Sequence, residues 1–96
     1  MGGDMNKLVE GRTWVLETLF QVAESSNNRI DDLMFIPTRD GQKLLLKLDG
    51  RLVCEKFQHP DVKYCAEGTT TKNEVLLCRA KVKKRLRNLL TTFPLT

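Results

Sequence analysis

Two apolar runs joined by Asp49-Gly50 constrain the fold of this chain more than any other stretch of its sequence. A two-residue Asp-Gly link is typical of a β-hairpin, because both residues tolerate the positive φ angles that the tight turn needs. The sequence therefore predicts two antiparallel strands over 43–48 and 51–57. Their register pairs Leu48 with Arg51, Lys47 with Leu52, Leu46 with Val53 and Leu45 with Cys54.

Both faces of this hairpin carry apolar side chains, since successive strand residues point to opposite faces. One face has Leu44, Leu46, Leu48 and Val53, and the other has Leu45, Leu52 and Cys54 around Lys47. A small antiparallel sheet with one solvated face usually alternates between apolar and polar positions. Two explanations stay open: a crowded inner face with one leucine at an edge, or an outer face that a partner covers.

Two further segments are predicted to extend this hairpin into a sheet. The apolar stretch 33–37 ends at a proline, which suits an edge strand before the turn over 38–42. His59-Pro60-Asp61 should end the strand before it, and 62–65 is predicted to form another strand. The expected sheet is therefore antiparallel, with three or four strands.

A long amphipathic helix is predicted after Thr71, which has Glu74 three residues later, as in a capping box. One side of this helix is apolar and carries Val75, Cys78, Val82, Leu86, Leu89, Leu90 and Phe93. The opposite side is cationic and carries Lys81, Lys84 and Arg87, with Lys83 and Arg85 on its flanks. Two residues break the pattern: Arg79 projects into the apolar arc, where it must snorkel or find a carboxylate, and Leu77 projects into the basic arc.

An earlier helix is predicted over about 5–24, and its apolar side carries Val15, Leu16, Leu19, Phe20 and Ala23. Gly11 is expected to interrupt it, so Thr13 is a candidate N-cap and the conformation of 5–11 stays open. Trp14 is expected to be a core or rim anchor. The polar stretch 25–28 should end the helix.

These elements predict an α+β fold of the order α-β-β-β-α in one domain over 1–96, with 1–5 disordered. The chain is 41% hydrophobic and 29% charged, which is typical of a globular domain. No apolar run approaches the roughly 20 residues that span a bilayer, so we expect a soluble protein without a membrane partner.

The positive charge is concentrated at the C-terminal end. Residues 72–96 hold seven Lys and Arg against one acid, whereas the rest of the chain holds nine against eleven acids, for a net charge of +4. This asymmetry favours an anionic partner. A solvated helix face, a membrane-surface contact and a calmodulin-type target are the other interpretations of this helix.

The three cysteines, Cys54, Cys65 and Cys78, are an odd number and no signal peptide precedes them, which predicts free thiols in a reducing compartment. A zinc site with His59 stays open, although no two cysteines have the close spacing of zinc ligands; three small buried side chains are the alternative. His59 has no nucleophile or acid at a catalytic spacing. We therefore predict no enzyme, no catalytic residues, no metal, no cofactor and no small-molecule substrate.

The entry into the last helix, Gly68-Thr69-Thr70-Thr71-Lys72, resembles the double-stranded-RNA-binding domain family. The likeness covers roughly 13–90 and includes the order of helices and strands. It implies that the loop 39–43 enters an RNA minor groove and that Glu17 contacts RNA.

The chain also departs from that family, because Lys72-Asn73-Glu74 and Leu76 replace its clamp of three lysines. In this respect it resembles the degenerate third domains of Dicer-partner proteins, which use the fold to pair with a protein. The Asp-Gly hairpin is also similar to those of the signal recognition particle Alu-binding subunits, which heterodimerise and bind RNA.

We therefore expect a non-catalytic module of this type that acts in RNA processing or silencing, in the cytoplasm or nucleus. Its partner is expected to be another protein chain or a second copy of itself. The residues expected to bind this partner are Leu45, Lys47, Leu52, Cys54 and Leu77. The alternative is direct binding of double-stranded or structured RNA through the basic helix 72–87 and the loop 39–43. The residues expected to contact RNA are Glu17, Arg39, Lys43, Lys72, Lys81, Lys84 and Arg87.

Overall fold

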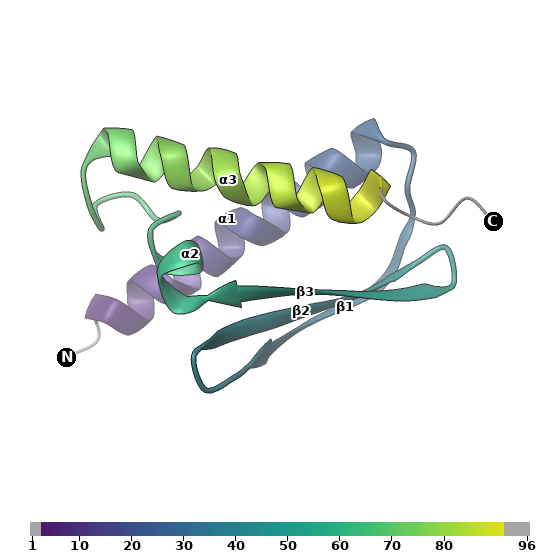
Figure 1. Cartoon of the computed structure of the whole chain (residues 1–96), viewed down its shortest axis with the longest axis horizontal. Coiled ribbons are helices and arrows are strands. Elements are labelled where there is room, and N and C mark those ends of the chain that lie inside the picture. The colour runs from purple at the N-terminus through teal and green to yellow at the C-terminus, as the bar shows by residue number, and fades with distance from the viewer. Residues whose placement is uncertain (1–2, 92–96) are drawn as a thin grey trace.

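The computed structural model describes residues 3–91, which form three helices and one antiparallel sheet. In chain order the elements are α1 (Gly3–Ser25), β1 (Ile30–Pro37), β2 (Gly41–Leu48), β3 (Arg51–Gln58), α2 (His59–Lys63) and α3 (Lys72–Thr91). The predicted α+β fold is confirmed: along the chain, the antiparallel sheet follows one long helix and precedes another (Figure 1). Residues 3–5, expected to be disordered, lie in α1, and 5–11 are helical.

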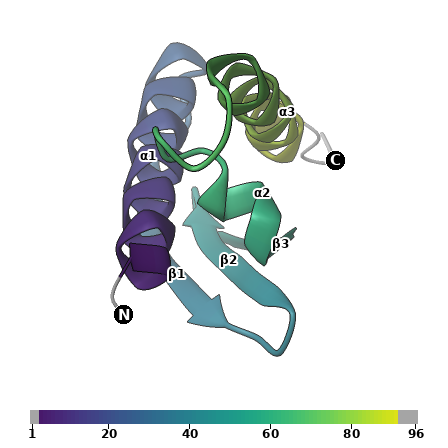
Figure 2. The same cartoon turned by 90° about the vertical axis from the view of Figure 1, so that its left-hand side faces the viewer.

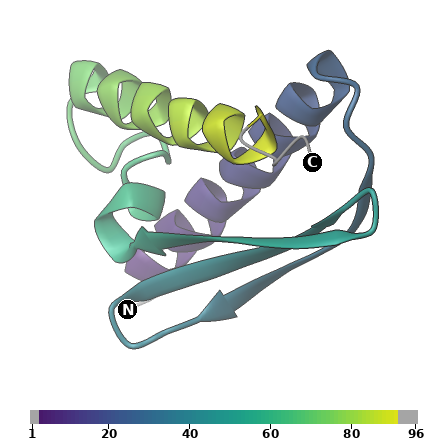
Figure 3. The same ribbon diagram turned by 45° about the vertical axis from the view of Figure 1, so that its right-hand side comes forward.

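The molecule has two layers, with all three helices on one side of the sheet (Figures 1, 2 and 3). The strand order is β1-β2-β3, so β2 is central. We call the side against the helices the covered face; it carries Leu33, Phe35, Gln42, Leu44, Leu46, Leu48, Val53, Glu55 and Phe57. We call the other side the helix-free face; it carries Asp32, Met34, Ile36, Lys43, Leu45, Lys47, Leu52, Cys54 and Lys56.

The predicted hairpin register is confirmed for every pair from Leu48 and Arg51 to Leu45 and Cys54. Asp49 and Gly50 both have positive φ angles, 48° and 85°, as a tight two-residue hairpin turn requires. A residue outside the hairpin also stabilises the turn, because the Gly50 N–H donates to the Asp31 carboxylate at 2.9 Å. This bond, followed by the ion pair with Arg29, lowers the pKa of Asp31 from its ordinary value.

The core lies between the covered face and the helices. Leu44, Leu46 and Leu48 have no exposed surface, and they meet Val15 and Leu19 of α1 and Leu86 of α3 in one apolar cluster. One prediction for α1 needs correction, because Phe20 is 51% exposed. Val22, which the predicted apolar side did not include, is buried. The apolar stripe therefore lies slightly further round α1 than the sequence pattern indicated.

The end of α1 was predicted correctly. Asn27 adopts a positive φ of 59° there, and the Asn28 N–H donates to the Ala23 carbonyl at 2.9 Å. The Asn28 side-chain amide also donates to the Leu90 carbonyl of α3 at 3.3 Å. The polar stretch thus ends one helix and fastens it to the other.

The expected break at Gly11 is wrong, because α1 runs without interruption through it. A Cβ atom at this position would lie 1.9 Å from the Val62 carbonyl oxygen of α2. Gly11 is therefore a point of close contact between two helices. Thr13 is not an N-cap either: its hydroxyl donates to the Val9 carbonyl within the helix.

The strand expected over 62–65 is also wrong. The chain forms α2 there, and the Asp61 carboxylate accepts the Gln58 N–H at 3.1 Å, as in a capping box. Pro60 stands in the first turn of α2, where its missing N–H costs no hydrogen bond. Across residues 3–91 the sheet therefore has three strands.

The start of α3 agrees with the prediction, since the Glu74 N–H donates to the Thr71 hydroxyl at 3.2 Å. Val75, Val82, Leu86 and Leu90 of its predicted apolar side are buried, whereas Phe93 lies outside the described residues. Within residues 3–91, Arg79 pairs with no carboxylate: its Nε donates to the Cys65 carbonyl at 2.8 Å, and its guanidinium lies 5.1 Å from the centre of the Trp14 ring.

Candidate interaction surface

The helix-free face consists of three rows of cross-strand neighbours, with Leu45 at their centre. The rows are Ile36–Lys43–Lys56, Met34–Leu45–Cys54 and Asp32–Lys47–Leu52. Residues directly opposite each other in an antiparallel pair lie on the same face of a sheet. One row is therefore wholly apolar, and it is flanked by rows that combine apolar and charged side chains.

The apolar residues of this face are substantially open to solvent. Leu52 is 73% exposed and Met34 is 55% exposed, whereas Leu45 and Ile36 are half-buried by their neighbours. A large apolar side chain in a strand centre normally packs under another layer. Here no helix or strand formed by residues 3–91 supplies one (Figure 3).

Three lysines and one acid give this face its charge. Lys43 and Lys56 are directly opposite each other, and Lys47 stands beside Leu45 on β2. Within residues 3–91 none of these lysines forms an ion pair. Like charges directly opposite each other destabilise a strand pair, so an acidic group placed over Lys43 and Lys56 would relieve repulsion.

The nine strand positions of the helix-free face include no aromatic residue. Phe35 and Phe57 are both on the covered face, where Phe57 is buried. A sheet that binds single-stranded nucleic acid typically stacks the bases on aromatic side chains. Along these three strands, the helix-free face therefore offers no aromatic side chain on which a base could stack.

The structure brings together four of the five residues predicted to bind a partner, since Leu45, Lys47, Leu52 and Cys54 all lie on the helix-free face. Leu77, the fifth, is 65% exposed on α3 and so belongs to the helical layer. The sequence prediction missed Met34, Ile36 and Lys56. The three-residue turn over 38–40 fixes the register of β1 on β2 and could have placed the first two.

The seven residues predicted to contact RNA are spread over several elements. Lys72, Lys81, Lys84 and Arg87 are exposed on α3, Arg39 is exposed between β1 and β2, Glu17 is exposed on α1, and Lys43 is half-buried on β2. Lys81, Lys84 and Arg87 follow one another at three-residue steps and form one stripe along α3, whereas Lys72 is the first residue of that helix and Lys43 belongs to the helix-free face. The molecule thus has two cationic surfaces, in different layers.

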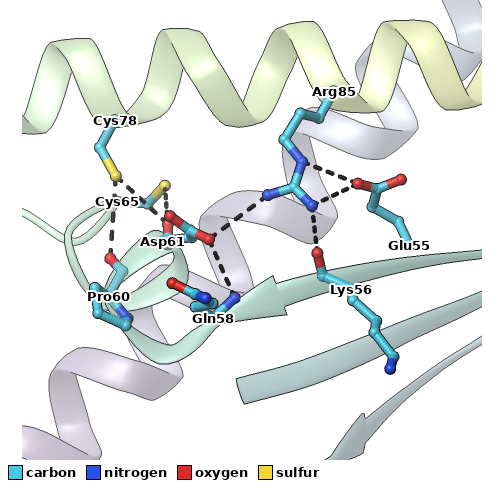
Figure 4. Close-up of polar contacts among 8 residues, drawn as sticks. All are labelled: Glu55, Lys56, Gln58, Pro60, Asp61, Cys65, Cys78 and Arg85. Carbon is cyan, nitrogen blue, oxygen red and sulfur yellow. Dashed lines mark hydrogen bonds and ion pairs between the residues drawn. The ribbon is translucent and has the colours of Figure 1, made fainter. Parts of the chain in front are cut away.

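Arg85 does not belong to the cationic stripe, because it joins α3 to the sheet (Figure 4). Its Nε donates to the Glu55 carboxylate at 2.9 Å, and its Nη1 lies 3.5 Å from the Asp61 carboxylate. Its Nη2 also donates to the Lys56 carbonyl, and the guanidinium lies 4.5 Å from the centre of the Phe57 ring. Arg85 therefore links α3 to both β3 and α2.

The zinc site considered for the cysteines and His59 is not supported by the structure. Cys54 is exposed on the helix-free face, whereas Cys65 and Cys78 lie together between α2 and α3. Across the described part of the chain, no group of three or more His, Cys, Asp and Glu side chains could hold a metal ion. His59 is the first residue of α2.

A hollow of about 800 Å³ lies between the beginnings of α1 and α3. Two of the three cations that line it, Lys7 and Arg79, are already engaged, and the third is Lys72. Lys7 pairs with Glu10 at 3.3 Å and donates to the Glu67 carbonyl, and Arg79 donates to the Cys65 carbonyl. The two acids Glu10 and Glu67 in its wall also oppose an anion. We assign it no ligand.

The described residues form a small α+β fold in which helices pack on one face of the sheet and none packs on the other (Figure 3). None of its helices within 3–91 is long and apolar enough to cross a membrane. No family model matches the sequence, and no curated protein or solved structure is significantly similar to it.

Proposed function

We propose that this chain is a non-catalytic binding module that associates with another protein through its helix-free face. The observation that carries this proposal is the apolar row Met34–Leu45–Cys54, with Leu52 beside it, open to solvent at the centre of a sheet. Covering these side chains would add roughly 25 cal/mol of stabilisation for each Å² of apolar surface buried.

The charge of the face favours a different protein over a second copy. Lys43, Lys47 and Lys56 against the single acid Asp32 leave each face with an excess of positive charge. Two such faces packed together would repel each other, whereas an apolar surface with acidic groups would be complementary. The expected partner is therefore a protein with an acidic and apolar contact surface.

The size of the sheet limits the affinity. Three strands of eight residues cover roughly 26 Å by 14 Å, at ~3.3 Å per residue and ~4.8 Å per strand. That flat area of roughly 370 Å² is about half of the ~800 Å² that a stable complex buries on each partner. The association is then of modest affinity, unless the partner also reaches the turns at the ends of the strands.

Cys54 offers a route to the partner, because its side chain is exposed on this face. A photo-crosslinker attached to Cys54 in a Cys78→Ser background should capture the partner, which is then identified by mass spectrometry and purified. Its affinity is measured for the wild type, for Leu52→Arg and for the matched control Leu77→Arg. These two leucines have similar exposure, 73% and 65%, but lie in different layers.

We expect Leu52→Arg to weaken binding by about tenfold or more, because it places a charge in the apolar contact, and Leu77→Arg to leave it nearly unchanged. Equal losses in both variants would contradict the assignment. A chain that sediments as a monomer and crosslinks to nothing would remove the proposal. A dimer that Leu52→Arg dissociates would replace the protein partner by a second copy.

Direct binding of RNA is a second candidate, and the cations of α3 favour it. Lys81, Lys84 and Arg87 are exposed and form no ion pair within the described residues. If they contact phosphates, the logarithm of the affinity for duplex RNA should fall with the logarithm of salt, by about 0.7 to 0.9 per contact. Replacing these three residues with alanine should then lower this slope by roughly two to three. Replacing Lys43, Lys47 and Lys56 with alanine tests in the same way whether the helix-free face contacts RNA.

The setting in RNA processing or silencing, in the cytoplasm or nucleus, rests on the resemblance of Gly68-Thr69-Thr70-Thr71-Lys72 to double-stranded-RNA-binding domains. We propose it on that ground alone. Failure to bind duplex RNA at low salt, together with a captured partner that is not part of an RNA-containing complex, would remove it.

A further inference from the structure

Two of the three cysteines form a pair of thiols between α2 and α3. Cys65 follows α2 and Cys78 lies in the first half of α3, and both Sγ atoms approach the Asp61 carbonyl oxygen, at 3.2 and 3.6 Å. Both sulfur atoms therefore lie within hydrogen-bonding reach of the same carbonyl oxygen, which places the two thiols close together. Figure 4 shows the two sulfur atoms side by side above Asp61.

Their surroundings keep both groups protonated at neutral pH. Burial raises the pKa of Cys65 to about 12, and the nearby Cys78 and Asp61 contribute in the same direction, whereas Arg79 opposes them. Burial and Asp61 raise the pKa of Cys78, and Lys81 opposes them. Cys65 is buried and Cys78 is half-buried, so Cys78 is the more accessible thiol.

We propose that Cys65 and Cys78 form a reversible disulfide by exchange with a small soluble disulfide such as oxidised glutathione. The Cys78 thiolate attacks one sulfur of glutathione disulfide, which releases one glutathione thiolate and leaves a mixed disulfide on Cys78. The Cys65 thiolate then attacks the Cys78 sulfur and releases the second glutathione thiolate. The cysteine pair loses two electrons and two protons, and glutathione disulfide gains the electrons and becomes two thiols.

The position of the pair defines what the disulfide would do. It would join the end of α2 to α3 and close the loop over 66–77 covalently, which constrains the unfolded chain. It lies in the helical layer, away from Leu45 and Leu52 on the helix-free face. The inference therefore goes beyond the proposed function and does not depend on it.

Cys54→Ser is the parent chain for the test, since it removes the exposed thiol that could link two molecules. The folded protein is incubated in glutathione redox buffer, and the products are analysed by intact mass and by peptide mapping without reduction. We expect a monomer that has lost two hydrogen atoms, a crosslinked peptide pair holding Cys65 and Cys78, a higher unfolding midpoint, and reversal by excess reduced glutathione.

Two further variants on the Cys54→Ser parent separate the two steps. Cys65→Ser should stop at a glutathione adduct on Cys78, and Cys78→Ser should leave the buried Cys65 almost unmodified. The rate should keep rising as the pH increases beyond the ordinary thiol pKa, because the thiolate is the reacting species. A parent chain that keeps both thiols, or that stops at the glutathione adduct, would overturn the inference. So would a crosslink that forms only after the protein unfolds.

Discussion

Both faces of the sheet carry apolar side chains, but within residues 3–91 helices pack on the covered face alone (Figure 3). On β2, Leu44, Leu46 and Leu48 have no exposed surface, whereas Leu45, between them in sequence, points to the opposite face and is only half-buried. On β3 the contrast is sharper, because Phe57 is buried and Leu52 is 73% exposed. Apolar residues in these strands are therefore buried only where helices reach them, and the helix-free face keeps an apolar centre that its own chain does not use.

The largest expected effect separates the two faces by stability. Leu46→Ala on the covered face should lower the free energy of unfolding by about 2–5 kcal/mol, because it removes a fully buried side chain and leaves a cavity. Leu52→Ala on the helix-free face should change it by no more than about 0.5 kcal/mol. Urea unfolding followed by circular dichroism measures both. Equal costs would show that the two faces are buried alike.

The next effect tests how tightly the helical layer closes over the covered face. Gly11→Ala should destabilise the chain by about 1–3 kcal/mol, because its Cβ would lie 1.9 Å from the Val62 carbonyl oxygen and force α1 and α2 apart. Thr13→Ala on the exposed side of α1 is the control and should stay near zero. A more stable Gly11→Ala protein would mean that α2 is not packed against α1 at this point, since alanine favours an open helix position.

Alkaline pH sharpens the comparison between a cysteine in each layer. The pKa of Cys65 is raised from its ordinary value of 9.0 to about 12, so the folded chain holds a proton that the unfolded chain loses in this range. Stability from this group is complete below about pH 9 and falls as the pH rises toward 12, with a slope of at most ~1.4 kcal/mol per pH unit. In urea titrations over this range, Cys65→Ala should reduce the slope, and Cys54→Ala, which removes the exposed thiol of the helix-free face, is the matched control. An equal slope in the wild type and in Cys65→Ala would exclude the protonated, buried thiol.

A smaller effect concerns neighbours on β3 that point to different faces. Glu55 is tied to Arg85 of α3 at 2.9 Å, whereas the Lys56 side chain lies on the helix-free face. Glu55→Gln should cost about 1 kcal/mol, because the Arg85 side chain is 38% exposed and solvent screens the pair. Lys56→Gln should cost nothing measurable or add a little stability by relieving Lys43. A double-mutant cycle with Arg85→Gln measures the coupling, and a coupling near zero would mean that Arg85 does not fasten α3 to β3.

The hairpin turn and the start of α3, which depend on a few adjacent residues, were predicted correctly, whereas a contact between distant residues was not. Asp49-Gly50 fixed the hairpin register and Thr71 with Glu74 fixed the start of α3, because a turn and a cap are decided by a few adjacent residues. Gly11 was misinterpreted as a break, because its close contact is with Val62, far along the chain. The strand expected at 62–65 ignored the cap formed by Gln58 and Asp61 and the proline between them.

The candidate surface was predictable in part for the same reason. Strand alternation placed Leu45, Leu52 and Cys54 on one face, but nothing local indicated that all the helices would lie on the other face. Leu45 was assigned to a partner because it belongs to the second apolar face of the hairpin, and Leu77 because it projects into the basic side of the last helix. The structure separates them into different layers, and only the tertiary arrangement could do so.

The most direct test of the account is the solvent accessibility of methyl groups in the isolated chain. With a soluble gadolinium relaxation agent, at a concentration where the chain sediments as a monomer, the Leu45, Leu52 and Met34 methyls should relax much faster than those of Leu44, Leu46 and Leu48. Addition of the captured partner should then protect the first group and leave the second unchanged. Equal protection of both groups in the isolated monomer would contradict the account, because the helix-free face would already be closed.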